Sequence, residues 1–248
     1  MKNQYFGDIN DYHKYGLLRA LTAAGDLSLS VCWMLTEDDG RRDGGKIRYL
    51  REPGRWRRFD PPLFDALQRA VADDDDRSVE RIESSGLLDG AGFCRGRLTD
   101  GAARRRSYFD AAWQTARGRE FIFFDPDNGV EVPSVRCGRR GSRKYIYYHE
   151  LVAAFEAGHS LLVYQHFPRV QRSVYTPALA GIIRSRTRCR SVISLATGHV
   201  LFLLATRPEH AAALARGVGR VRARWGRQFE IVDHVAPMVT STGCGAGS

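Results

Sequence analysis

The stretch Glu120-Phe-Ile-Phe-Phe-Asp-Pro-Asp-Asn-Gly129 decides the fold class of this chain. Residues 121–124 are all apolar, a pattern typical of a strand buried on both faces, as in a parallel sheet between helices. Pro126 cannot donate to a sheet ladder, so we expect the strand to stop at Asp125. Two carboxylates and an amide then follow the strand's carboxyl end, where open α/β sheets hold their ligands. An ordinary strand followed by an Asx turn gives the same pattern, so this stretch alone leaves both interpretations open.

The size and charge of the chain limit its class and its partners. Its 248 residues, 43% hydrophobic and 27% charged, suffice for one large or two modest globular domains. Lys and Arg number 38 against 28 Asp and Glu, for a net charge of +10. Arginine binds phosphate through two parallel hydrogen bonds, so a nucleic-acid partner, in particular RNA, is one explanation. A GC-rich genome that encodes arginine in place of lysine is the other.

Cysteine usage and hydropathy predict a cytoplasmic protein without membrane contact. The five cysteines lie far apart, form no CxxC pair and are odd in number: Cys32, Cys94, Cys137, Cys189 and Cys244. This spacing indicates reduced thiols and argues against a structural zinc site. The first residues lack the apolar core of a signal peptide, and no apolar run approaches the roughly 20 residues of a membrane span.

The rest of the chain shows alternating strand and helix patterns. We expect strands at 27–35, 160–164 and 229–232, and a hairpin within 191–206 around Thr197-Gly198. Helices are expected from Asn10 or Asp11 to about Ala24, and over 61–71, 104–113, 150–157, 171–190 and from 207 onward. The predicted fold class is α/β, Rossmann-like, with a mostly parallel sheet, helices on both faces and a C-terminal antiparallel hairpin. One domain would span 1–239, with a small insertion at about 73–103 that could hold a short strand near Phe93, and 240–248 would be a disordered tail.

Polar residues follow three of the predicted strands. The first strand leads into Thr36-Glu-Asp-Asp-Gly40, the central one into Asp125-Pro-Asp-Asn128, and the next into Gln165-His-Phe-Pro-Arg169. The carboxyl ends of parallel strands meet at one edge of a sheet, so we expect these residues to gather there. A flexible, basic loop at 133–144 fits a contact with a phosphate backbone, and a plain solvated loop fits equally well.

This arrangement resembles the class I, S-adenosylmethionine-dependent methyltransferases, and among them the RlmJ-like ribosomal RNA methyltransferases, which modify the exocyclic amine of an adenine. Gly7, Asp11 and Lys14 stand at the spacing of that family's Gly, Asp and Lys in its opening helix. The strand 31–35 with Thr36 resembles the strand before the family's cofactor loop. Asp125-Pro126 begins where its Asp-Pro-Pro-Tyr motif begins, and the later strand with Tyr164 and Pro168 resembles its Trp-Tyr-Pro segment.

The resemblance implies a cofactor, a substrate and a set of roles. It implies S-adenosylmethionine as the cofactor and RNA as the substrate. The implied catalytic residues are Asp125, Asp127, Asn128 and Lys14; the implied cofactor-binding residues are Thr36, Asp38, Asp39 and Gly40; the implied substrate-binding residues are Tyr5, Asp11, His166 and Arg169.

Two departures from the family's pattern open other interpretations. The cofactor loop has a single glycine between carboxylates, and Asp127-Asn128 replaces the Pro-Tyr whose aromatic ring stacks on the flipped base. Oxygen ligands from Asp38, Asp39, Asp125 and Asp127 could instead hold Mg or Mn, which would suit a phosphoesterase or nuclease. A catalytically inactive nucleic-acid-binding module is the third interpretation.

Overall fold

A seven-stranded sheet forms the centre of the protein. The computed structural model describes residues 1–23, 25–38, 40, 45–72 and 77–235. The strand order is β2-β1-β3-β6-β8-β7-β9, in which β2, β1, β3 and β6 are parallel and the ladders from β6 to β9 are antiparallel. The strands are β1 (Leu29–Cys32), β2 (Gly92–Cys94), β3 (Phe121–Phe124), β6 (Ser160–His166), β7 (Ser191–Ala196), β8 (Val200–Ala205) and β9 (Glu230–Val235). The predicted α/β, Rossmann-like fold with a late hairpin is confirmed.

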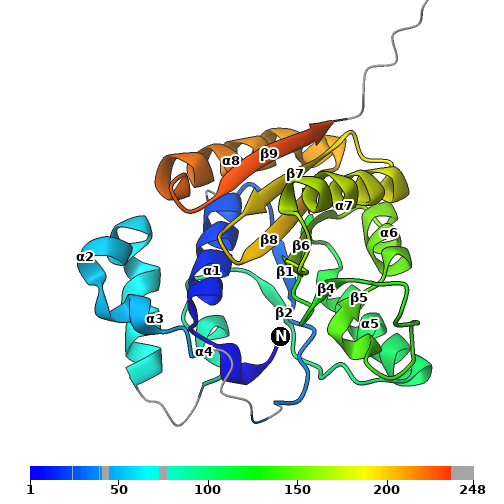
Figure 1. Ribbon diagram of the computed structural model, residues 1–248, viewed down its shortest axis with the longest axis horizontal. Helices are drawn as coiled ribbons and strands as arrows, with labels where there is room; N and C mark the ends of the chain where they lie inside the picture. Colours follow the sequence, from blue (N-terminus) through cyan, green and yellow to red (C-terminus); the bar gives the residue numbers. More distant parts are fainter. Residues whose placement is uncertain (24, 39, 41–44, 73–76, 236–248) are drawn as a thin grey trace, which may run out of the picture.

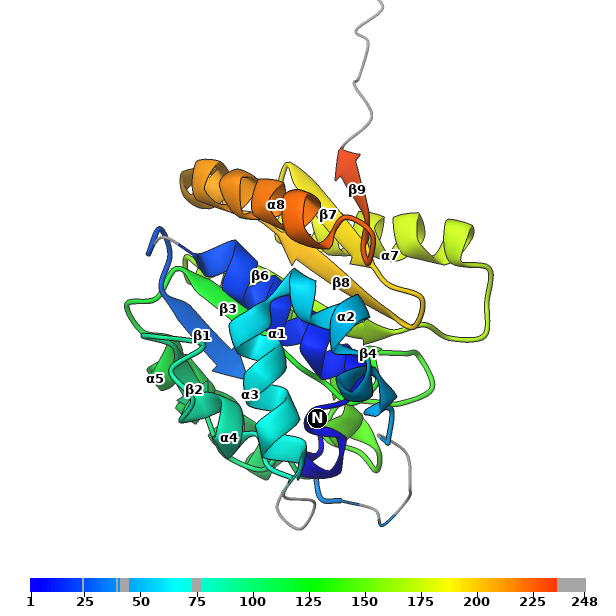
Figure 2. The same cartoon turned by 90° about the vertical axis from the view of Figure 1, so that its left-hand side faces the viewer.

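Helices cover both faces of this sheet. The first face carries α1 (Ile9–Thr22), α3 (Pro61–Ala72) and α8 (Ala211–Trp225), which share one apolar cluster. The opposite face carries α5 (Ala102–Ala116), α6 (Tyr148–Glu156) and α7 (Arg172–Thr187), which share a second cluster. In Figure 1, α1 and α3 lie to the left of the strands, α8 runs along the top beside β9, and the second group lies to the right; Figure 2 shows the first group turned toward the viewer.

All four residues of β3 are buried, and their side chains point alternately to the two faces of the sheet. Phe121 and Phe123 enter the cluster under α1 and α8, whereas Ile122 and Phe124 enter the cluster under α5 and α6. Each face of the strand therefore meets a helix layer, as expected for a central parallel strand. The backbone N–H of Asp125 still donates to Cys32 O at 3.0 Å, and Pro126 then ends the ladder.

Helix α1 is largely buried, and its first turns lie at the carboxyl edge of the sheet. It starts at Ile9, and Asp8 caps it by accepting hydrogen bonds from the backbone of Asn10 and Asp11. The predicted cap at Asn10 or Asp11 was therefore wrong by a few residues, because the Asp8 side chain reaches the free N–H groups of the first turn. Gly16 lets α1 approach α8 closely, since a Cβ at this position would lie 2.1 Å from the Trp225 ring.

Short elements connect these layers. They are η1 (Asn3–Tyr5), η2 (Arg48–Arg51), α2 (Pro53–Trp56), η3 (Arg57–Phe59), α4 (Glu80–Glu83), β4 (Gly129–Val130), η4 (Ser142–Lys144), β5 (Tyr145–Ile146) and η5 (Pro208–His210). The segment 73–103, considered as an insertion, contributes β2 to the main sheet, where it pairs in parallel with β1. Residues 73–76 of that segment lie outside the described residues, as does the tail 240–248.

The basic loop 133–144 is fastened by hydrogen bonds on both sides. β4 and β5 pair in parallel and bring its ends together. The Asp100 carboxylate accepts from the backbone N–H groups of Gly141 and Arg143 at 2.9 and 3.0 Å. Arg105 donates to Ser142 O and Tyr145 O. The expected flexible loop is thus tied to the body of the protein at several points.

Across the described residues, none of the helices combines the length and the apolar character that crossing a membrane requires.

Candidate functional site

A pocket of about 540 Å³ opens at the carboxyl edge of the sheet. It lies where α1 begins and where β3 and β6 end, at the position that open α/β sheets use for ligands. Its lining residues come from four segments: Met1, Tyr5, Asp8, Asn10, Asp11 and Lys14; Gly45 and Lys46; Asp125, Pro126 and Asp127; Tyr164 and His166.

A buried lysine between two carboxylates lies against this pocket. Lys14 Nζ is 2.7 Å from Asp11 Oδ1 and 2.7 Å from Asp125 Oδ2, and all three residues are almost completely buried. Asp11 Oδ2 also accepts hydrogen bonds from the Gly7 N–H and the Tyr15 hydroxyl. Burial by itself lowers the pKa of a lysine, but the two carboxylates outweigh it and raise the Lys14 pKa above its ordinary value. Lys14 therefore carries a permanent charge here.

The two carboxylates that follow β3 have opposite electrostatic environments. Burial raises the pKa of Asp125, even though the charges of Lys14 and the Met1 ammonium oppose the shift. Burial also acts to raise the pKa of Asp127, but the Met1 ammonium, 2.7 Å away, and the hydroxyl of Thr36 bring it below its ordinary value. Asp125 is consequently the more basic of the two, and Asp127 serves as a fixed anion.

The Met1 ammonium lies across the ends of β1 and β3. It donates to Met34 O at 3.3 Å and to Asp125 O at 3.0 Å in addition to its ion pair with Asp127. Two backbone carbonyls and one carboxylate thus form a set of acceptors around an α-ammonium group. The backbone N–H of Thr36 donates to Met1 O at 2.9 Å, which holds Met1 beside these acceptors.

Asp8 adds a further carboxyl group to the pocket that the sequence interpretation did not assign. Burial, followed by the nearby charge of Asp11, raises its pKa from 3.8 to about 7. The neighbouring Asn10 also lines the pocket and was likewise missed. No pattern in the sequence singled out these two residues, because Asp8 precedes the helix and the burial of both depends on how α1 packs against the sheet.

Tyr164 forms an aromatic wall of the pocket. The ammonium of Lys14 lies 5.1 Å from the centre of its ring, and its hydroxyl is 3.3 Å from His166 Nε2. Loss of solvent around the His166 ring and the charges of Lys14 and Met1 lower the His166 pKa to about 4. Because the side chain stands at the exposed end of β6, solvent limits the size of this shift.

Six of the residues predicted for the site line this pocket together: Tyr5, Asp11, Lys14, Asp125, Asp127 and His166. Thr36 reaches it through its 2.7 Å hydrogen bond to Asp127. The other predicted residues that the structure describes lie elsewhere. Asn128 turns away and donates to the Tyr145 hydroxyl at 2.9 Å, and Arg169 is exposed beyond β6. Asp38 is exposed and accepts from the Gln4 N–H, Gly40 is exposed, and Asp39 lies outside the described residues.

Three of the four carboxylates considered for Mg or Mn belong to the described residues, and these three are not gathered around one point. Among the described residues, Asp38, Asp125 and Asp127 do not form a group whose ligand atoms lie within 4.8 Å of one another. Asp125 and Asp127 instead have internal cations, Lys14 and the Met1 ammonium, at 2.7 Å each. These cations stand where a metal ion would have to bind.

The fold and the site define an α/β, Rossmann-like protein with a buried ion-pair cluster beneath a polar pocket. A comparison with protein-family models found no match, and a comparison with curated proteins found none either.

Proposed function

We propose that the chain is a methyltransferase-like enzyme that transfers a methyl group from S-adenosylmethionine to the amine of a nucleic-acid base. The observation that carries this proposal is the Asp11–Lys14–Asp125 cluster at the pocket. It combines a basic, buried carboxylate with a fixed cation at the carboxyl end of a central strand. Methyl transfer to an amine requires a group that holds the amine and accepts its proton, and Asp125 suits that role.

Lys14 is the positioning residue for Asp125. Its ammonium holds Asp125 Oδ2 at 2.7 Å and Asp11 Oδ1 at the same distance, so the carboxylate cannot turn freely. Asp11 is in turn held by Gly7 and Tyr15. A chain of charge-assisted hydrogen bonds thus fixes the proton acceptor before the substrate arrives, which lowers the reorganisation needed in the reaction.

The pocket offers hydrogen-bond acceptors to an amine. Its carboxylates belong to Asp8, Asp11, Asp125 and Asp127, and three ammonium groups, those of Lys14, Lys46 and Met1, face them. Because Asp8 has a pKa of about 7, these charges nearly balance at neutral pH, and the carboxylate oxygens can accept hydrogen bonds from an exocyclic amine. Tyr5 and Tyr164 supply aromatic surface for a base taken out of its stack. Phosphate contacts would fall to exposed arginines outside the pocket, such as Arg136, Arg139 and Arg140.

The acceptors around Met1 fit one part of the cofactor. Met34 O, Asp125 O and the Asp127 carboxylate surround an α-ammonium group. The same atoms would hold the α-ammonium of S-adenosylmethionine, in competition with Met1. When bound, the cofactor supplies the methyl group, and the residues of this chain bind it, orient the amine and accept its proton at Asp125.

Two measurements test this function. Calorimetry with S-adenosylhomocysteine is expected to show saturable binding, and single-stranded RNA oligonucleotides containing adenine are expected to become methylated. Asp125→Asn should lower the methylation rate about a hundredfold or more, because it removes the proton acceptor but keeps the shape. Asp233→Asn, at an exposed position on β9, is the matched control and should keep the rate. Absence of heat at high micromolar cofactor, or full activity of Asp125→Asn, would overturn the proposal.

A further inference from the structure

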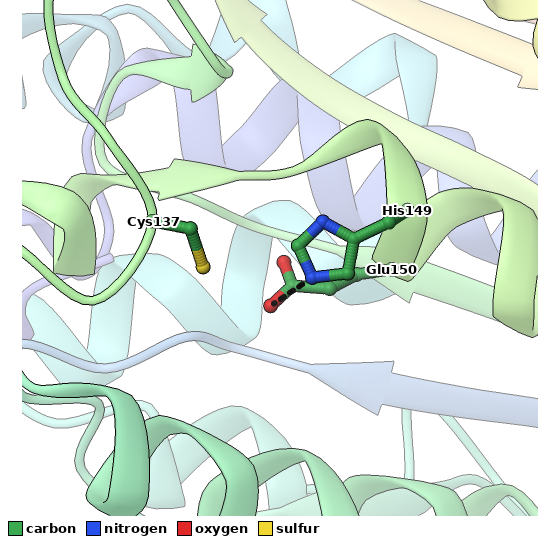
Figure 3. A group of neighbouring side chains, drawn as sticks. All are labelled: Cys137, His149 and Glu150. Atoms are coloured by element: carbon green, nitrogen blue, oxygen red, sulfur yellow. Dashed lines mark ion pairs between the residues drawn. The ribbon is translucent and has the colours of Figure 1, made fainter.

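A second group of reactive side chains lies outside the pocket. Cys137 Sγ, a nitrogen of His149 and a carboxylate oxygen of Glu150 all lie within 4.8 Å of one another. Cys137 comes from the basic loop between β4 and β5, and the other two residues come from the first turn of α6 (Figure 3). None of the three lines the candidate site.

The backbone that carries Cys137 is held against the start of α6. The hydroxyl of Tyr147 donates to Val135 O at 3.0 Å, and Arg105 donates to Ser142 O at 3.0 Å on the other side of the loop. Tyr147 is also the N-cap of α6, so the loop and the helix start share this residue. The three side chains therefore stand on segments whose relative position is already fixed, which favours ligand binding at low entropic cost.

Glu150 is oriented by a buried arginine. Arg105 donates from Nε to Oε1 at 2.6 Å and from Nη2 to Oε2 at 2.7 Å, and the Tyr147 N–H also donates to Oε2. Among the described residues, Oε1 thus accepts one hydrogen bond and keeps a second lone pair, and it lies 4.0 Å from His149 Nε2. Metal-binding carboxylates are commonly held by such outer hydrogen bonds.

We propose that Cys137, His149 and Glu150 bind a zinc ion. A thiolate, an imidazole and a carboxylate are all ligands that zinc accepts, and the thiolate disfavours magnesium and calcium. Ligand atoms around tetrahedral zinc lie about 3.3–3.8 Å apart, so the three ligand atoms have to approach one another by about 1 Å when zinc binds. Cys137 and His149 are exposed and can turn to do so, while Glu150 stays fixed. Three protein ligands leave a fourth position for water.

The charges around the ion set its strength of binding. Zinc displaces the thiol proton of Cys137 into solvent, and the resulting thiolate and the Glu150 carboxylate balance the two charges of the ion. Arg105 adds one positive charge behind the carboxylate. This site should therefore bind zinc more weakly than the four-ligand sites of zinc fingers. Its effect is to link the basic loop to α6, independently of the reaction at the pocket.

Cobalt provides the most direct test, because a cobalt–thiolate bond gives a charge-transfer band in the near ultraviolet. The metal-free protein titrated with Co²⁺ should develop this band, and Zn²⁺ should abolish it. Cys137→Ser should lose the band, and His149→Ala should weaken binding about tenfold or more. The matched control for the histidine is His199→Ala at another exposed position, and Cys189→Ser changes a buried thiol away from the site; once circular dichroism shows that they are folded, both should bind as the parent does. Both test positions are exposed, so these variants should fold.

Limited digestion with trypsin supplies a second readout. Arg136, Arg139 and Arg140 are exposed on the same loop as Cys137. Zn²⁺ should slow cleavage after these arginines in the parent protein and in Cys189→Ser, but not in Cys137→Ser. A cobalt band that persists in Cys137→Ser, or zinc protection that is equal in all variants, would overturn the proposal, as would absence of binding at high micromolar metal.

Discussion

Lys14 Nζ and Asp125 Oδ2 lie 2.7 Å apart although 111 residues separate them along the chain. The first belongs to α1 and the second directly follows β3, so this ion pair joins α1 to one of the inner parallel strands of the sheet. The pair bears on both the stability of the protein and the proposed chemistry, because both residues are buried and line the pocket.

Lys14→Met removes the cation that Asp11 and Asp125 share and keeps most of the side-chain volume. We expect the free energy of unfolding at pH 7 to fall by about 3–5 kcal/mol, since two buried carboxylates lose their partner. Urea denaturation followed by circular dichroism measures the change. Lys46→Met is the control, because Lys46 lines the same pocket but is exposed, and it should shift stability by no more than about 0.5 kcal/mol. Equal effects of the two substitutions would contradict the buried ion pair.

Asp8→Asn should change how stability depends on pH between about pH 4 and pH 7. The pKa of Asp8 is about 7 in the folded protein against 3.8 for an ordinary aspartate. A raised pKa contributes stability below pH 3.8 that is lost as pH rises through 7, because the folded state then holds a buried charge beside Asp11. Asparagine keeps the cap of α1 without that charge. The stability gain of the variant over the parent should therefore grow between about pH 4 and pH 7 and stay level above that, as measured by urea denaturation; a constant difference over the whole range would count against it.

His13 should contribute to unfolding in acid. Burial lowers its pKa from 6.5 to about 4, and its Nε2 lies 3.1 Å from Gln228 Oε1 among aromatic rings. A lowered pKa contributes stability above pH 6.5 that is lost as pH falls toward 4. Between pH 7 and pH 5 this group should cost about 2 kcal/mol. His13→Gln should show a correspondingly flatter loss of stability over this range, and a parallel curve for the variant would refute the assignment.

Gly16 and Gly219 form a matched pair of helix substitutions. A Cβ at Gly16 would meet the buried Trp225 ring at 2.1 Å, whereas a Cβ at Gly219 meets nothing within 4 Å. Gly16→Ala should therefore destabilise the protein by about 1–3 kcal/mol through overpacking between α1 and α8. Gly219→Ala should stabilise it by up to about 1 kcal/mol through better helix propensity. Thermal unfolding of both variants measures whether their stabilities change in opposite directions. A more stable Gly16→Ala would contradict the close packing of α1 against α8.

The sequence predicted strands best where one pattern dominated. The strand over 121–124 and the hairpin around Thr197-Gly198 were found at their observed places. The first strand was expected over 27–35 but is limited to Leu29–Cys32. Met34 adopts a left-handed backbone with φ 48°, which an apolar residue rarely does and which hydropathy cannot reveal.

The sequence predicted the position of the site more accurately than the contacts between its residues. Parallel strands bring their carboxyl ends to one edge, so Asp125, Asp127 and His166 were expected together and are found together. Asn128 follows Asp127 directly but turns to Tyr145, because the backbone enters β4 there. Asp8 and Asn10 escaped notice because their burial depends on the position of α1 against the sheet.

The fold class and the edge at which polar groups collect could be predicted from the sequence, because apolar runs and turn residues act over a few neighbours and encode strands directly. The ion pair between Lys14 and Asp125 and the approach of Cys137 to His149 and Glu150 could not be predicted in this way. These contacts depend on how a helix or a loop is docked on a distant segment, and on which rotamer its packing allows. Spacing along the chain does not record that information.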